Sequence, residues 1–256
     1  MDFAWVLPRR LNRISSLTVQ WVGEERERTW VKRKSKLEFQ RFAEVPAQLE
    51  GEEESDRLVD WRRGHGSFEV PPEAYPSFET THSTRIQWCL EVLVARGRRR
   101  PIELKVPVLV SPPEFEPREV TELEEPSFDH RIGESDALRV AFDRPDLALR
   151  PGDHQVAEIS WQFPEVPSRL EWNLYWEAGS EGRQATLGVF GEVLLGSEAS
   201  GSTRVSWTAP AFPFSLEGRI VRVDWVFEVV AKTRQGETRV SVPVIISPDG
   251  TRVKWE

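Results

Sequence analysis

The chain has 256 residues, of which 39% are hydrophobic and 30% charged, and its formal net charge is −8. This composition excludes an extended disordered chain, the acidic balance argues against a nucleic-acid-binding protein, and no apolar run reaches the roughly 18 residues that a membrane-spanning helix needs. The single cysteine, Cys89, excludes an internal disulfide and a cysteine-based metal cage, and the start MDFAWVLPRRLNR lacks the features of a signal peptide, so we expect a cytoplasmic protein without a transmembrane segment.

The first segment, Met1–Trp21, alternates apolar and polar residues toward its end, which is typical of half-buried strands. It aligns with Ala157–Trp176 in the second half, and in this alignment the two final tryptophans match. In the second half another strand and turn, Leu138–Val156, precede the segment. We therefore expect the amino-terminal domain to lack its opening strand and to leave a vacant sheet edge beside Leu17–Trp21.

The next part of the chain is rich in charged residues. Gly23–Arg28 is predicted to be a charged turn, and Thr29–Phe42 is predicted to form one or two strands with a solvated basic face. Ser55 is a residue type that caps helices, and the apolar residues that follow it lie close together in the sequence. This pattern predicts a short amphipathic helix over Asp56–Arg63.

One stretch of the sequence occurs twice, as Ser67–Pro112 and as Ser206–Pro248. In both copies an aromatic-proline pair precedes a tryptophan by the same spacing, a Trp-x-x-Glu-Val motif follows, and the stretch closes on Val-Pro-Val and Ser-Pro. Alternating apolar residues on both sides of a glycine-containing turn predict a hairpin in each copy. The tryptophans at the centres of these hairpins are Trp88 and Trp225. We interpret the protein as one domain type that has been duplicated.

The duplication predicts two domains, residues 1–112 and residues 137–256, joined by an acidic linker rich in proline and glutamate over residues 113–136. Short alternating strands with proline and glycine turns, and little helix, are typical of antiparallel sandwiches. The predicted fold is therefore all-β, with two tandem antiparallel β-sandwich domains of immunoglobulin-like type.

Two such domains in tandem, each ending on a Val-Pro-Val strand, resemble the arrestin superfamily. The residues that carry the resemblance match its Phe-x-x-Pro, Pro-Ser-Phe and Ile-x-Trp pattern: Gly66, Phe68, Pro71, Pro72, Pro76, Ser77, Phe78, Arg85, Ile86 and Trp88. Leu17–Arg26 is similar to its strand-Gly-x-x-Arg segment, and Pro151-Gly152-Asp153 resembles the turn that opens its second domain. The chain lacks a PPxY-type ligase-recruiting tail and looks closer to the bacterial arrestin-like proteins linked to sporulation control, or to the retromer-type subunit. The resemblance implies an arrestin-like adaptor.

The sequence has no catalytic signature, and its four histidines stand singly, so we expect neither an enzyme nor a cofactor or metal site. Arginine suits phosphate and carboxylate oxygens, and the resemblance implies that basic residues of the first domain contact phosphate or acidic partners. The alternative interpretation is solvated charge that protects strand edges. Two basic clusters qualify, one on a predicted strand and one at a predicted hairpin tip: Lys32, Arg33, Lys34 and Lys36, and then Arg98, Arg99 and Arg100.

We therefore predict a non-enzymatic adaptor or scaffold that binds protein partners, including phosphorylated or acidic segments, through sheet edges, the crease between the domains and the basic clusters. The vacant edge of domain one would accept an extended peptide as an added strand, and it also offers a route to homo-oligomers. One alternative is a carbohydrate-directed or hydrolytic β-sandwich protein, in which some of the 11 tryptophans form a sugar-stacking platform. Another alternative is a self-assembling structural protein.

Overall fold

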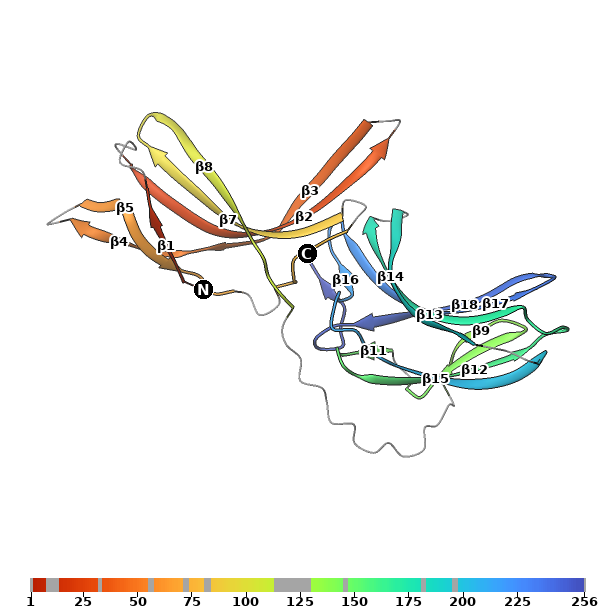
Figure 1. Ribbon diagram of the computed structural model, residues 1–256. Coiled ribbons are helices and arrows are strands. Elements are labelled where there is room, and N and C mark those ends of the chain that lie inside the picture. The colour runs from red at the N-terminus through yellow and green to blue at the C-terminus, as the bar shows by residue number, and fades with distance from the viewer. Residues whose placement is uncertain are drawn as a thin grey trace. The chain divides into compact units, whose positions relative to one another are not determined.

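The computed structural model describes residues 2–7, 14–31, 34–54, 58–70, 74–80, 84–112, 130–144, 147–180, 183–194 and 198–255. All the regular elements in these ranges are strands, so the predicted all-β, sandwich-type class is confirmed. The chain divides into two compact units, Met1–Ser111 and Pro112–Glu256 (Figure 1). Residues 113–129 of the predicted linker lie outside the described residues.

The first unit consists of a five-stranded sheet and a three-stranded sheet. The larger sheet has the order β3-β2-β7-β6, with β8 also paired to β7, and the smaller has the order β1-β5-β4. The strands run β1 (Asp2–Val6), β2 (Ser16–Val31), β3 (Lys34–Pro46), β4 (Gln48–Glu54), β5 (Leu58–Ser67), β6 (Phe78–Glu79), β7 (Thr84–Arg96) and β8 (Arg99–Val108).

The second unit has more described strands than the first. Its four-stranded sheet has the order β15-β12-β10-β9, and its seven-stranded sheet has the order β11-β18-β17-β13-β14, with β16 on β17 and β19 on β16. The strands run β9 (His130–Glu134), β10 (Leu138–Phe142), β11 (Ala148–Leu149), β12 (His154–Gln162), β13 (Arg169–Ser180), β14 (Arg183–Leu194), β15 (Ser200–Thr208), β16 (Leu216–Glu217), β17 (Arg222–Thr233), β18 (Gly236–Ile246) and β19 (Val253–Lys254).

The two copies of the repeated stretch fold into hairpins with the same register. Trp88 lies opposite Val108 in the β7–β8 hairpin, and Trp225 lies opposite Val244 in the β17–β18 hairpin. Each tryptophan is buried, and its indole N–H donates a hydrogen bond of 2.7 Å to a backbone carbonyl of the aromatic-proline pair that precedes it. The repeat in the sequence therefore encodes the same strand pairing and the same tryptophan anchor in both units.

Side chains from both sheets of each unit meet in its core. In the second unit one continuous cluster joins the strands of both sheets, and Trp172 stacks on Phe227 with ring centroids 5.5 Å apart. In the first unit two smaller clusters do the same, and Phe68 bridges Phe3 of β1 and Trp21 of β2. Burial of the alternating apolar residues is the main driving force for both arrangements.

Two of the local predictions are wrong. Gly23–Arg28 is not a turn, because it lies within β2 and pairs with both β3 and β7. A strand tolerates these charges because Glu24 is neutralised by Arg26 and Lys105. In the segment predicted as a helix, residues 55–57 lie outside the described residues, and the remainder begins β5, which pairs with β1 and β4. Backbone hydrogen bonds on both sides outweigh a helix of two turns, which is marginal in water.

The alignment of the opening segments was also wrong by two residues. Trp21 lies opposite Leu90, whereas Trp176 lies opposite Trp225, so the structural counterpart of Trp176 is Gly23.

The edge predicted to be vacant beside Leu17–Trp21 is filled only in part. Among the described strands Ser16–Val19 pair with β7 alone, whereas residues 20–27 of β2 pair with both β3 and β7. The opening strand of the second unit, β10, pairs with β12. The first-unit strand that aligns with β12 is β1, which among the described strands pairs with β5 alone.

Candidate functional site

The basic residues predicted to bind an acidic partner are partly visible. Lys32 and Arg33 lie outside the described residues, and the backbone of Lys34 begins β3. Lys36 is exposed on β3, with its ammonium 2.5 Å from the carboxylate of Glu38. The remaining three residues lie at the tip of the β7–β8 hairpin and are all exposed: Arg98, Arg99 and Arg100.

The structure does not bring these two groups together. Lys36 pairs with Thr29, beyond the end of β2 that meets Thr84, whereas the arginines follow Arg96 at the other end of β7. At a rise of about 3.3 Å per residue the two ends of β7 lie roughly 40 Å apart. Figure 1 shows the tips of the β2–β3 and β7–β8 hairpins at opposite ends of the sheet. Lys36 and the three arginines therefore cannot form one anion site.

Among the described residues of the first unit, a polar cluster surrounds two buried glutamates on the neighbouring strands β2 and β7. The Lys105 ammonium lies 3.1 Å from a carboxylate oxygen of both Glu24 and Glu91. Arg26 contacts Glu24 at 2.5 Å, and Arg41 contacts Glu91 at 2.7 Å. Gln20 supplies a further hydrogen bond to Glu91. Each carboxylate oxygen of this pair thus has a cation or an amide as its partner.

The electrostatics of this cluster indicate a structural role. Burial opposes ionisation of Glu24, but hydrogen bonds from Arg26 and Lys105 outweigh it and hold the pKa below its usual value. Burial likewise opposes ionisation of Glu91, and hydrogen bonds from Gln20 and Lys105 again lower the pKa. A carboxylate with a lowered pKa and saturated oxygens is a poor general base at neutral pH. The cluster therefore stabilises the sheet rather than supplying a reactive group.

The second unit contains a counterpart of Glu91. Glu228 occupies the same place in the Trp-x-x-Glu-Val motif and accepts hydrogen bonds from Tyr175, Arg239 and Ser241, at 3.2, 3.1 and 3.0 Å. Burial, followed by the charge of Glu228, raises the pKa of Tyr175 to about 12. The sequence motif therefore marks a buried anchor of the hairpin in both units, and not a binding site.

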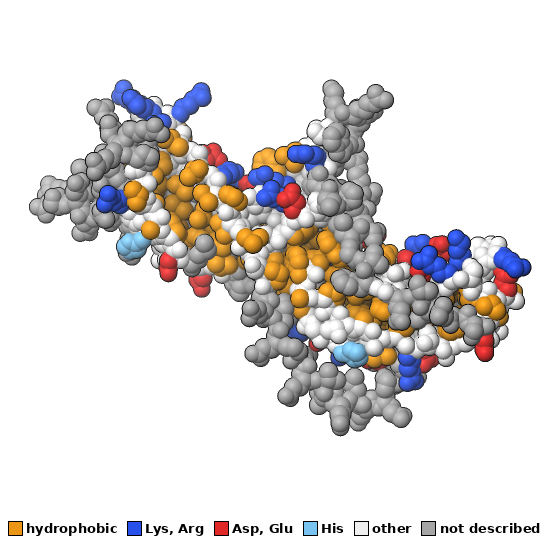
Figure 2. All heavy atoms as spheres, in the orientation of Figure 1, with side chains coloured by type: hydrophobic (Ala, Val, Ile, Leu, Met, Phe, Trp, Pro, Cys, Tyr) orange, Lys and Arg blue, Asp and Glu red, His pale blue; other side chains and the backbone are white. Residues whose placement is uncertain are grey.

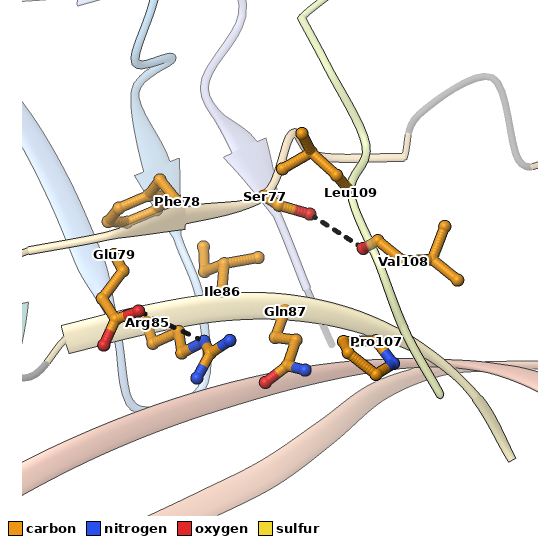
Figure 3. Close-up of a pocket in the computed structure, with 9 residues that line it drawn as sticks. All are labelled: Ser77, Phe78, Glu79, Arg85, Ile86, Gln87, Pro107, Val108 and Leu109. Carbon is orange, nitrogen blue, oxygen red and sulfur yellow. Dashed lines mark hydrogen bonds and ion pairs between the residues drawn. The ribbon is translucent and has the colours of Figure 1, made fainter. Parts of the chain in front are cut away.

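A groove lies at the edge of the larger sheet of the first unit (Figure 3). It encloses about 380 Å³, and we call it the β6 groove; its lining comes from three segments, Ser77–Glu79, Arg85–Gln87 and Pro107–Leu109. Both β6 and β8 pair with β7, and the groove opens where one ends and the other begins. Figure 3 shows Ile86 between β6 and β7, with Leu109 above the end of β8.

The walls of the β6 groove combine apolar and charged groups. Leu109 is 80% exposed, although it follows directly on a strand. The Arg85 guanidinium lies 3.7 Å from the Glu79 carboxylate, and the backbone N–H of Val110 donates to the Ser77 hydroxyl at 3.0 Å. Figure 2 shows hydrophobic side chains at the surface of the first unit. Leu104 and Val106 of β8 are also exposed. The groove is suited to an extended segment with both apolar and polar side chains.

The β6 groove was not predicted from the sequence. The Val-Pro-Val and Ser-Pro motifs mark its position, but the same motifs occur in the second unit, where β19 pairs with β16 at the corresponding edge. Four tryptophans that a sugar-stacking platform could use lie in the cores: Trp88, Trp172 and Trp225 are buried, and Trp176 packs against the core.

Within the described ranges no group of three or more His, Cys, Asp or Glu residues could hold a metal ion, and no helix is long and apolar enough to cross a membrane. A scan against protein-family models finds no match, and a search of curated proteins finds none.

Proposed function

We propose that the protein is a cytoplasmic, non-enzymatic adaptor of the arrestin-like type, which binds segments of partner proteins through its first unit. The observation that carries this proposal is the β6 groove, where a sheet edge and the exposed Leu109 lie side by side. Sheet edges bind extended peptides through backbone hydrogen bonds, and pockets beside them select side chains. A single free cysteine suits a reducing compartment.

The arginines at the tip of the β7–β8 hairpin support an acidic or phosphorylated segment as an additional contact. Three exposed guanidinium groups in succession, Arg98–Arg100, offer paired hydrogen bonds to carboxylate or phosphate oxygens. They lie on the same hairpin as β8, so one partner could contact both the tip and the strand. The arginine tip lies at the end of β7 opposite the β6 groove, so a partner that contacts both must extend along β8. Lys36 lies beyond the other end of β7 and is not part of the tip.

The alternatives have less support. A sugar-stacking platform needs exposed aromatic rings, whereas Trp88, Trp172 and Trp225 are buried in the cores. A hydrolytic site needs an activated nucleophile or base, whereas the carboxylates of Glu24 and Glu91 are saturated by cations and amides. Self-assembly would give an apparent mass that rises with protein concentration, which sizing detects.

The test is affinity enrichment from a lysate of the source cells, read by mass spectrometry. The intact chain is compared with a variant carrying Arg98→Ser, Arg99→Ser and Arg100→Ser and with Leu109→Glu. We expect a partner protein that the intact chain recovers and that at least one variant loses. Identical recovery by all three chains, with each monodisperse and folded, would contradict the proposal.

A further inference from the structure

The second unit shows what occupies the edge that corresponds to the β6 groove. There β19 pairs in parallel with β16, and Leu216 lies opposite Val253. The backbone N–H of Val253 donates to the Ser215 carbonyl at 3.1 Å, and that of Trp255 donates to the Glu217 carbonyl at 3.2 Å. An extended segment thus completes the sheet edge in the second unit.

The acceptor groups of this edge are present in the first unit at the same register. Phe78 and Glu79 pair with Ile86 and Arg85, as Leu216 and Glu217 pair with Val223 and Arg222. Each copy also has a serine next to this strand that binds the returning strand. The Ser77 N–H donates to the Val110 carbonyl at 2.9 Å, and the Ser215 N–H donates to the Ile246 carbonyl at 2.7 Å. The carbonyls of Ser77 and Glu79 are therefore the counterparts of those that bind β19.

Among the described strands β7 alone pairs with β6. The fold-back of β19 rests on residues that the first half of the sequence does not have at the same positions. The fold-back depends on the Asp249 carboxylate, which accepts hydrogen bonds of 2.8 Å from the N–H and the hydroxyl of Thr251, and on Gly250 at φ +80°. The corresponding residues of the first half are Pro113 and Glu114. Proline has no carboxylate to accept these bonds, and glutamate is strained at a positive φ.

The side chains of β19 and its neighbours indicate which side chains would suit a segment that pairs with β6 in the first unit. Arg252 lies 2.5 Å from Asp224, and Lys254 lies 3.3 Å from Glu217, so two basic residues flank the apolar Val253. In the first unit Glu79 takes the place of Glu217, and Gln87 takes the place of Asp224. A basic residue is therefore favoured opposite Glu79, and a neutral polar residue near Gln87.

We propose that the β6 groove binds an extended segment of a partner protein as an added parallel strand with the pattern polar, aliphatic, basic. The backbone N–H groups of this segment donate to the carbonyls of Ser77 and Glu79, its aliphatic residue lies opposite Phe78, and its Lys or Arg pairs with the Glu79 carboxylate. This proposal rests on the proposed adaptor function and names the site and the class of segment.

The chain itself supplies the probe, a fluorescein-labelled peptide with the sequence of Ser247–Trp255, SPDGTRVKW. Its binding to the intact chain is measured by fluorescence anisotropy. We expect saturable binding that Glu79→Lys weakens by about tenfold or more, because an attractive pair becomes repulsive. The matched change in the second unit, Glu217→Lys, should leave the affinity within about twofold, since that edge is occupied by β19.

A charge exchange makes the test independent of folding effects. A peptide carrying Lys254→Glu should bind the Glu79→Lys chain at least about tenfold more tightly than the unaltered peptide does, because the pair is restored with reversed signs. Circular dichroism confirms that each variant is folded. Absence of binding to the folded intact chain, or equal affinity for intact chain and Glu79→Lys, would overturn the assignment of the groove.

The remaining outcomes separate this inference from the adaptor function. A partner that is recovered from lysate through Arg98–Arg100, together with failure of the peptide to bind, would leave the adaptor proposal standing and reject the groove. Peptide binding that depends on Glu79, without any partner recovered from the lysate, would support the groove and count against the adaptor proposal. Dimerisation that Glu79→Lys abolishes would identify a second copy of the chain as the occupant and overturn the proposal of a partner protein.

Discussion

The two units use the same hairpin but finish the sheet around it differently. In the second unit β11 pairs with the end of β18, and β19 pairs with β16, so the end of the hairpin and the strand beside it are both covered. In the first unit the corresponding positions are the end of β8 and β6, where Leu109 is exposed. One repeated motif is therefore enough to fix a hairpin and its tryptophan anchor, whereas the covering of the edge depends on residues outside the motif.

The largest expected effect tests whether the tryptophan anchor belongs to each unit separately. Trp225→Ala should lower the free energy of unfolding of the second unit by about 3–5 kcal/mol, because it removes a fully buried indole from a continuous core. Hydrogen exchange at increasing urea concentration, read by mass spectrometry, measures the free energy of unfolding of the second unit at β17 and of the first unit at β7. Trp88→Ala is the matched change in the first unit. A loss below about 1 kcal/mol, or an equal loss at both strands, would contradict independent anchoring.

The second-largest expected effect is a difference in acid sensitivity, because the first unit should lose more stability than the second as the pH falls. Because the pKa of Glu24 and of Glu91 is lowered in the folded state, the unfolded chain binds more protons, and stability rises with pH in that range. The contribution of these two carboxylates to the stability of the first unit is complete above the glutamate pKa of the unfolded chain, about 4.3. It is lost as the pH falls through the lower pKa of the folded state.

Among the described residues of the second unit, the carboxylates with a lowered pKa, Glu237 and Asp249, are exposed, so solvent screens their contribution. The urea midpoint of β7 should therefore fall more steeply than that of β17 between about pH 5 and pH 3.

The variant Glu24→Gln provides the control for this prediction. It should cost the first unit about 2 kcal/mol at pH 7, because it removes charge-assisted hydrogen bonds from a buried carboxylate, and it should flatten the acid dependence. Parallel pH profiles for the two units, or a profile that the variant leaves unchanged, would show that the cluster does not distinguish them.

The smallest effect concerns the turn that folds β19 onto its neighbour. Gly250→Ala should destabilise the second unit by about 1 kcal/mol, because alanine is strained at φ +80° although no atom lies within clashing distance of its Cβ. Hydrogen exchange at Val253–Trp255 should rise more than exchange at β17. Gly97→Ala, in the β7–β8 turn, is the matched change in the first unit, and it should leave Val253–Trp255 unaffected.

Much of the fold could be predicted from the sequence because it depends on local patterns. Alternation identified the strands, and the spacing from the aromatic-proline pair to the tryptophan identified the repeated hairpin. Gly23–Arg28 could not be predicted in this way, because its strand depends on Lys105, which is distant in the sequence. The alignment error between Trp21 and Trp176 arose because a shift of two residues keeps the same face of a strand.

The candidate site was predicted less well. Of the basic clusters, the arginine tip is exposed as expected, but the structure separates it from Lys36 by the length of β7. The β6 groove could not be predicted, because a groove at a sheet edge is defined by the strand that does not pair there. The comparison of the two edges identifies it, because β19 covers β16 whereas no described strand besides β7 pairs with β6.

Cys89 gives the first unit a built-in chemical reporter. Its side chain is buried on β7, and burial, together with the charge of Glu24, raises the pKa of its thiol. The thiolate is the reactive form, so the sulfur stays inert while β7 keeps its neighbours. It is the chain's single cysteine, so any thiol-directed label or oxidant that reacts with this protein counts openings of the first unit and does not register those of the second.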